Sequence, residues 1–128
     1  MADWPNEDWA ASFAAATDGL PQVSGTSGTV VMKFTGGTRK EISVHWRYQD
    51  GVAAVGEVGT SADADLEFTL AAPDATDVIS GAVEPSVAFM RGRLKASGDG
   101  GLLLAFLQST TSADFAGWRE KVAAATPL

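Results

Sequence analysis

The sequence has no cysteine, one histidine and one tyrosine among its 128 residues. Without cysteine it can form neither a disulfide framework nor a thiolate metal site, and we expect a reducing, cytoplasmic environment. No run of the sequence approaches the ~20 apolar residues of a membrane span, and the acidic N-terminus lacks the basic and apolar regions of a signal peptide. We therefore expect no stable membrane insertion.

Basic residues are also scarce, because 9 Lys and Arg stand against 16 Asp and Glu, which gives a formal charge of -7. Nucleic acid is an improbable partner for such a chain, since phosphate contacts need a basic face. What remains is an ordinary globular composition, with 45% hydrophobic and 20% charged residues. The length suits one domain over residues 1–128 with a single core.

Hydrophobic periodicity predicts an α+β fold. Trp9, Phe13, Ala16 and Leu20 recur at the spacing of one helical face, which predicts an N-terminal helix. Five alternating segments predict strands, the first three joined as an antiparallel meander. Proline opens two short helices after the fourth strand, and two more helices follow the fifth. One face of the sheet can be covered by all the helices. The predicted strands lie at 30–34, 42–48, 52–58, 66–70 and 93–97.

The helix predicted after Asp99 has an unusually wide apolar side. At about 100° per residue, its leucines and Phe106 spread over roughly 200° between residues 102 and 107, twice the width of an ordinary buried stripe. Leu103 lies at the centre of this arc, so we expect it to point at the sheet together with Phe106 and Leu107. The wide arc needs a deep core, a partner or an apolar ligand to cover it.

Asp99 is a suitable N-cap for this helix, and Thr111 with Asp114 suggests a capping box for the last helix.

A set of short motifs between Asp65 and Gln108 carries a family resemblance. The motifs are Asp65-Leu66-Glu67-Phe68, Ile79-Ser80-Gly81, Glu84-Pro85, and Ala88-Phe89-Met90-Arg91-Gly92-Arg93-Leu94-Lys95 running into Gly98-Asp99. With them the chain resembles the lipid-binding domain of the sterol carrier proteins. The resemblance implies a five-stranded mixed, mostly antiparallel sheet with helices on one face. It also implies an apolar tunnel between sheet and helices for a sterol, fatty acid or acyl chain.

The large apolar residues are the candidate ligand contacts, although they would form a core in any fold. The residues predicted to line the tunnel are Phe34, Trp46, Phe68, Phe89, Met90, Leu94, Leu103, Phe106, Leu107 and Trp118. Tyr48 or the region of Arg91 and Arg93 would orient the ligand at the mouth.

The polar candidates favour structural roles. His45 is the only histidine and shares the outer face of its strand with Ser43 and Arg47, so we predict neither a metal nor a catalytic site. The acidic sets, Asp63-Asp65-Glu67 and Asp74-Asp77, are typical of solvated faces. The Gly98–Gly101 turn lacks the spacing of a nucleotide-binding loop. The alternating Arg91, Arg93 and Lys95 could meet an acidic carrier protein or pathway enzyme, but a solvated face is the simpler interpretation.

These observations predict a lipid carrier that binds an apolar ligand non-covalently, without cofactor. Two alternatives remain open, a biosynthetic cyclase or isomerase that uses the same tunnel, and an interaction module of a pathway complex. Polar residues in the cavity would favour the enzyme, an apolar lining would favour the carrier, and a filled core would favour the module.

Overall fold

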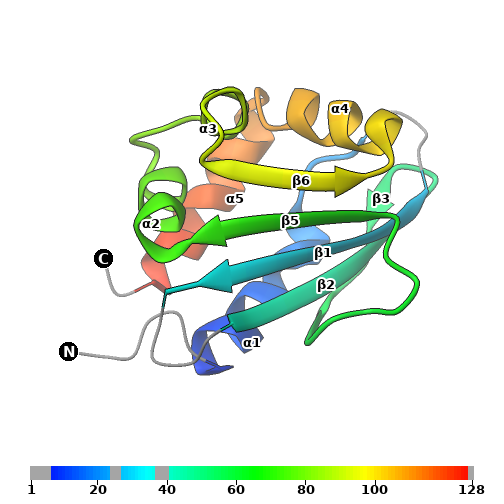
Figure 1. Cartoon of the computed structure of the whole chain (residues 1–128), viewed down its shortest axis with the longest axis horizontal. Coiled ribbons are helices and arrows are strands. Elements are labelled where there is room, and N and C mark those ends of the chain that lie inside the picture. Colours follow the sequence, from blue (N-terminus) through cyan, green and yellow to red (C-terminus); the bar gives the residue numbers. More distant parts are fainter. Residues whose placement is uncertain (1–6, 24–26, 37–40, 127–128) are drawn as a thin grey trace.

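The computed structural model describes residues 7–23, 27–36 and 41–126 as one α+β unit (Figure 1). The elements follow the predicted order along the chain. They are α1 (Glu7–Ala16), η1 (Thr17–Gly19), β1 (Gly28–Thr35), β2 (Glu41–Gln49), β3 (Val52–Ala53), β4 (Glu57–Val58), β5 (Leu66–Ala71), α2 (Ala72–Ser80), α3 (Pro85–Met90), β6 (Leu94–Gly98), α4 (Gly100–Ser109) and α5 (Ala113–Ala124).

The sheet is mixed and mostly antiparallel, which confirms the predicted fold class. Its strand order is β3-β2-β1-β5-β6, and β4 pairs with β2 beside β3. Only the β1–β5 pairing is parallel among the described strands. The register places Met32 between Val44 and Phe68, so the apolar positions of three strands share one face.

The predicted third strand at 52–58 is divided into β3 and β4, so the sheet has six strands rather than five. The backbone between the two halves is hydrogen-bonded to the end of α1 and to η1. Gly56 donates its N–H to the Ala14 carbonyl at 2.9 Å, and the Thr17 hydroxyl donates to the Ala54 carbonyl at 2.9 Å. Periodicity along residues 52–58 cannot reveal these bonds, because their partners lie some forty residues away.

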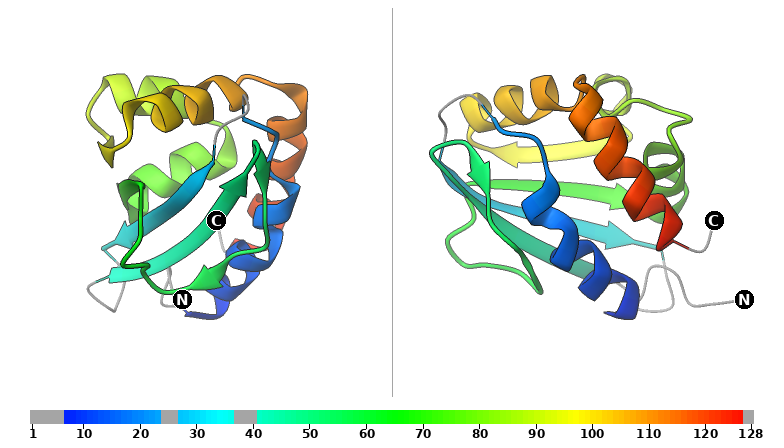
Figure 2. Two further views of the ribbon diagram at one scale, coloured as in Figure 1. Left: turned by 90° about the vertical axis from the view of Figure 1, so that its right-hand side faces the viewer. Right: turned by 180° about the vertical axis from the view of Figure 1, so that it is seen from behind.

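The helices surround the inner face of the sheet and close one hydrophobic core. Seen from behind, α1 and α5 cross that face, while α4 and α3 lie beyond the β6 edge (Figure 2). All five α-helices supply buried side chains to a single apolar cluster with the inner strand positions. Neighbouring rings link α1, β1 and β2 at its centre, with Phe13 5.6 Å from Phe34 and 6.2 Å from Trp46 between ring centroids.

The junction between β6 and α4 depends on glycine and on a cap. Gly98 has a φ of 126°, and a Cβ atom there would lie 2.2 Å from the Asp65 carbonyl oxygen. The Asp99 carboxylate accepts a hydrogen bond from the Leu102 N–H at 3.1 Å, which confirms the predicted N-cap of α4. The cap of α5 lies one residue later than predicted, because Ser112 rather than Thr111 accepts from the Phe115 N–H.

Candidate ligand-binding site

A small apolar cavity of about 50 Å³ lies between the inner face of the sheet and the helices. A cavity of this size can hold a water molecule or two but no lipid chain, since ligand pockets are typically about 300–1,000 Å³. The described residues thus show a small void where the family resemblance implies a tunnel. Its lining consists of Phe13, Leu20, Met32, Phe34, Trp46, Leu70, Val78, Ile79, Pro85, Leu94, Phe106, Phe115, Trp118, Arg119 and Val122.

Five of the ten predicted ligand contacts line this cavity. They come from five different elements, and the fold brings them together from positions more than eighty residues apart. These residues are Phe34 of β1, Trp46 of β2, Leu94 of β6, Phe106 of α4 and Trp118 of α5. Alternation alone placed the first three on the inner sheet face, while Phe106 and Trp118 reach them from helices.

The other five predicted contacts lie outside the lining. Phe68 is buried beneath Phe106, with ring centroids 5.1 Å apart, and Leu107 is buried in the same core. Phe89 and Leu103 are half-buried at the edge of the core. Met90 is 83% exposed, so in this structure it faces solvent rather than a ligand. Met90 ends α3 immediately before the turn into β6, where its side chain has left the covered face.

The buried side of α4 is rotated from the predicted one. Leu102 and Phe106 are buried, whereas Leu103 is half-buried and Leu104 is 68% exposed. Leu103 is therefore not at the centre of the buried arc. Thr110 is buried at the end of the same stripe, where its hydroxyl donates to the Leu107 carbonyl at 2.6 Å. Because this bond satisfies the hydroxyl within its own helix, the threonine is buried without an unpaired polar group.

Helix α5 contributes four lining residues, three of which are not among the predicted ligand contacts. Phe115 and Val122 are buried, and with Trp118 they form one face of the helix. That periodicity is visible in the sequence and was the available signal for these residues. The fourth residue, Arg119, has its Nη1 atom 3.1 Å from a carboxylate oxygen of Glu84, and its guanidinium lies 5.4 Å from the Phe115 ring centroid.

An open groove of about 590 Å³ runs along the outside of the same wall, between residues 16–22 and α5. Leu20 and Trp118 line both the groove and the cavity, so these side chains separate the two spaces. The Trp118 indole N–H donates to the Ala16 carbonyl at 2.7 Å, which holds α5 against the end of α1.

Two buried polar groups lie on the inner face of β2. Trp46 is 2% exposed and Tyr48 is fully buried, and their ring centroids are 6.4 Å apart. Neither the Trp46 Nε1 atom nor the Tyr48 hydroxyl has a hydrogen-bond partner among the described residues. Burial raises the pKa of the Tyr48 hydroxyl to about 12, an effect that the neighbouring Trp46 N–H opposes. Tyr48 thus lies deep in the core and not at a mouth.

The outer polar groups are paired within the protein. His45 accepts or donates through Nδ1 at the Gly59 carbonyl (2.9 Å), and its Nε2 atom lies 3.7 Å from Glu57. Asp65 accepts from the Thr29 N–H at 2.8 Å, and Glu67 pairs with Lys33 at 3.1 Å. Within the described residues, no group of three histidine or acidic side chains could hold a metal ion.

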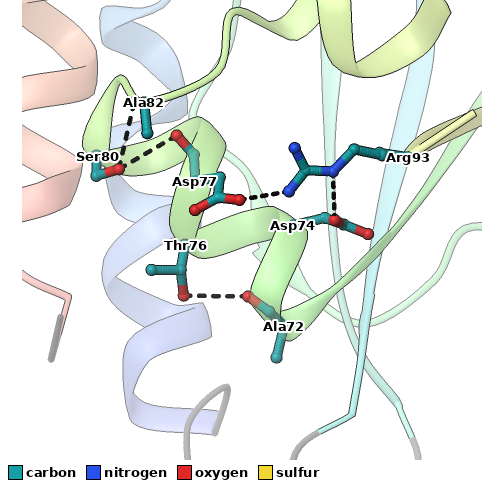
Figure 3. Close-up of polar contacts among 7 residues, drawn as sticks. All are labelled: Ala72, Asp74, Thr76, Asp77, Ser80, Ala82 and Arg93. Atoms are coloured by element: carbon teal, nitrogen blue, oxygen red, sulfur yellow. Dashed lines mark hydrogen bonds and ion pairs between the residues drawn. The ribbon is translucent and has the colours of Figure 1, made fainter. Parts of the chain in front are cut away.

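Arg93 bridges β6 and α2 instead of presenting a free charge. Its guanidinium contacts both Asp77 and Asp74, the latter with Nε 2.6 Å from Oδ1 (Figure 3). The hydrogen bonds that it donates to Asp77 and then to Asp74 raise the pKa of Arg93 further above its ordinary value. The basic stripe that could have met an acidic partner is therefore reduced to the exposed Arg91 and Lys95.

Comparison with known proteins gives a consistent fold and family. A sequence model described as the SCP-2 sterol transfer family matches residues 10–109. No curated protein matches the chain by sequence. No helix in the described part of the chain is long and apolar enough to cross a bilayer.

Three solved structures share the architecture at low identity. A crystal structure of sterol carrier protein 2 is 18% identical with a TM-score of 0.62, covering 92% of this chain and 95% of its own. The solution structure of palmitated SCP2L2 from Aedes aegypti is 16% identical with a TM-score of 0.62, covering 82% and 94%. A conserved hypothetical protein from Thermus thermophilus is 17% identical with a TM-score of 0.59, covering 94% and 85%. At these identities the likeness concerns the fold.

Proposed function

Because the chain belongs to the SCP-2 sterol transfer family, we propose that it binds an apolar lipid-like molecule non-covalently between the sheet and its helices. The observation that carries the proposal is the apolar cavity, whose lining is aliphatic and aromatic apart from Arg119. It lies between the sheet and α5, where a bound lipid would contact apolar side chains from both layers.

Binding requires the cavity to expand, and the helix side is the wall that can move. Strands β2, β1, β5 and β6 are joined edge to edge by hydrogen bonds, so the sheet cannot open without breaking a ladder. Helix α5 instead touches the cavity through side chains and is held by contacts such as Trp118 to Ala16 and Arg119 to Glu84. The groove beside Leu20 and Trp118 leads to the same wall and is the proposed entry route.

The energies of opening and filling are of comparable size. Separating Phe115, Trp118 and Val122 from the core costs about 1.5–3 kcal/mol for each side chain, or roughly 5–9 kcal/mol in all. A twelve-carbon chain that enters the space gains roughly 10 kcal/mol at about 0.8 kcal/mol per methylene, and it covers the same side chains again. The ligand therefore offsets the cost of opening, whereas water does not.

The apolar lining favours a carrier over an enzyme. Catalysis by a preorganised cavity needs polar groups aimed at the reacting atoms. The only charged lining residue in the described chain, Arg119, is paired with Glu84 and lies against Phe115. The described lining thus provides an apolar environment for a ligand and presents no unpaired acid, base or nucleophile to it.

The test is saturable uptake of the neutral fluorophore diphenylhexatriene, followed by its emission and by energy transfer from tryptophan. Phe106→Ala removes a lining ring, which destabilises the closed core by about 3–5 kcal/mol but costs less when a ligand fills the space. We expect this variant to bind the fluorophore at least fivefold more tightly than the parent.

Leu104→Ala is the matched control, because Leu104 is 68% exposed on the same helix. It should bind the fluorophore as the parent does, whereas adsorption to surface leucines would be weakened. Absence of saturable uptake by the parent, or equal affinity of the parent and Phe106→Ala, would overturn the proposed function.

A further inference from the structure

The described residues contain three tryptophans in or beside the core, and two of them have paired indole N–H groups. Trp9 donates to the Thr126 hydroxyl at 2.8 Å and Trp118 to the Ala16 carbonyl at 2.7 Å. Trp46 has no such partner in the described chain although it is the most deeply buried of the three. Buried polar groups are nearly always paired, so this exception calls for a physical reason.

The second unpaired group lies beside it. Residues 46 and 48 alternate along β2 and face the same side of the sheet, and the Tyr48 ring stands at 72° to the indole. The hydroxyl is close enough to the indole N–H for the latter to affect its ionisation, yet neither group satisfies the other. The pair therefore presents one indole donor and one hydroxyl that can donate or accept.

One member of this pair, Trp46, reaches the cavity, and Tyr48 is buried next to it outside the lining. Trp46 lines the void directly, and its other ring neighbours are Phe13 at 6.2 Å and Phe106 at 6.4 Å. A molecule that expands the cavity towards β2 would meet the indole first and the phenol behind it. The atoms that face the void are apolar, so a ligand reaches the indole N–H and the phenol only when it displaces the side chains that cover them. The expanded pocket would then have apolar walls and a short polar end, which is the usual arrangement of a pocket that orients one end of its ligand.

We propose that Trp46 and Tyr48 together bind a neutral hydroxyl or carbonyl oxygen at one end of the apolar ligand. The inference rests on the proposed function and deepens it, because it assigns the ligand class: a mostly hydrocarbon molecule with one uncharged oxygen. A hydroxyl oxygen accepts from the indole N–H and exchanges a hydrogen bond with the phenol.

An anionic head group fits this place less well. The one cation in the lining, Arg119, lies in α5 and is engaged by Glu84, and Arg47 of β2 faces the opposite side of the sheet, where it donates to Thr29. The burial that keeps the phenol of Tyr48 protonated would also disfavour a carboxylate there. The oxygen that the pair receives is therefore uncharged.

The experiment measures displacement of diphenylhexatriene by dodecan-1-ol, dodecane and dodecanoate at pH 8, for the parent protein and Tyr48→Phe. The parent should prefer the alcohol to the alkane and to the carboxylate. Tyr48→Phe should lower affinity for dodecan-1-ol about tenfold and leave affinity for dodecane unchanged. Its urea midpoint without ligand should be no lower than that of the parent, since the hydroxyl it removes is unpaired.

Two tryptophan variants separate hydrogen bonding from space. Trp46→Phe and Trp118→Phe both remove an indole from the lining, but only the Trp118 N–H is already paired. The alcohol-to-alkane affinity ratio should fall about tenfold in Trp46→Phe and stay constant in Trp118→Phe.

Each contrary result has one meaning. An affinity ratio that is the same in the parent and in Tyr48→Phe and Trp46→Phe would overturn the inference while leaving a carrier. A preference for dodecanoate that disappears in Tyr48→Phe would overturn the uncharged oxygen. A parent that takes up none of the probes would overturn the proposed function itself.

Discussion

Adding one methylene group at Val122 tests whether the void under α5 is real and whether a ligand uses it. Val122 is 3% exposed and lines the cavity, so Val122→Ile places its extra carbon beside empty space. At about 24 cal/mol per Å³, a void of about 50 Å³ costs the closed protein roughly 1.2 kcal/mol. The added methylene contributes about 0.8 kcal/mol of burial, so we expect Val122→Ile to gain about 1 kcal/mol.

Val30→Ile is the matched control, because it adds the same atom to a fully buried valine that does not line the cavity. Overpacking there should cost about 1–3 kcal/mol. The assay is urea unfolding, in which a gain of about 1 kcal/mol shifts the midpoint by roughly 0.3–1 M at slopes of about 1–3 kcal/mol per M.

Ligand binding should respond in the opposite direction to stability. A closed form that is about 1 kcal/mol more stable must be opened by the ligand, so dodecan-1-ol should bind Val122→Ile about fivefold more weakly. Equal destabilisation by both substitutions would show that no void exists at Val122. A gain in stability with unchanged affinity would show that the ligand binds elsewhere.

Two further predictions concern the core and the β6–α4 junction. The Tyr48 hydroxyl ionises near pH 10 when unfolded and near pH 12 when folded, so the folded protein holds the proton more tightly. Stability should therefore fall by about 1.4 kcal/mol per pH unit between pH 10 and 12, measured as urea midpoints, and Tyr48→Phe should lack this part of the decline. Gly98→Ala should cost more than about 2 kcal/mol, because its Cβ meets the Asp65 carbonyl in a left-handed conformation, whereas Gly117→Ala, in open space within α5, should gain about 0.5–1 kcal/mol. An alanine tolerated at residue 98 would refute this account of the junction.

Local sequence patterns were sufficient to predict a structural feature where all the residues that determine it lie in one short segment. The alternation in β1, β2 and β5 predicts which side chains face inward, because successive residues in a strand point to opposite faces. Asp99 is recognisable as a cap because its partner, the Leu102 N–H, is three residues away. The fold class followed from the order of such segments together with the family motifs.

The candidate site was only half visible in the sequence. Phe34 and Trp46 were found because strand alternation orients them, but Met90 was placed inside on its hydrophobicity alone and is exposed. A wide apolar arc on α4 allowed several rotations, and the neighbours of that helix selected the one that buries Leu102 and leaves Leu104 outside.

The sequence by itself determined the secondary structure order, the inner faces of the main strands and the family. Only the tertiary structure decided that the core closes to a void of about 50 Å³ and that α5 forms its outer wall. It also decided that Trp46 and Tyr48 have no hydrogen-bond partner in the described part of the chain, while Trp9 and Trp118 have one each. The physical reason is that volume and hydrogen-bond satisfaction depend on atoms brought together from distant segments, such as the 102 positions between Trp118 and Ala16. Neither property is encoded in the period of a single helix or strand.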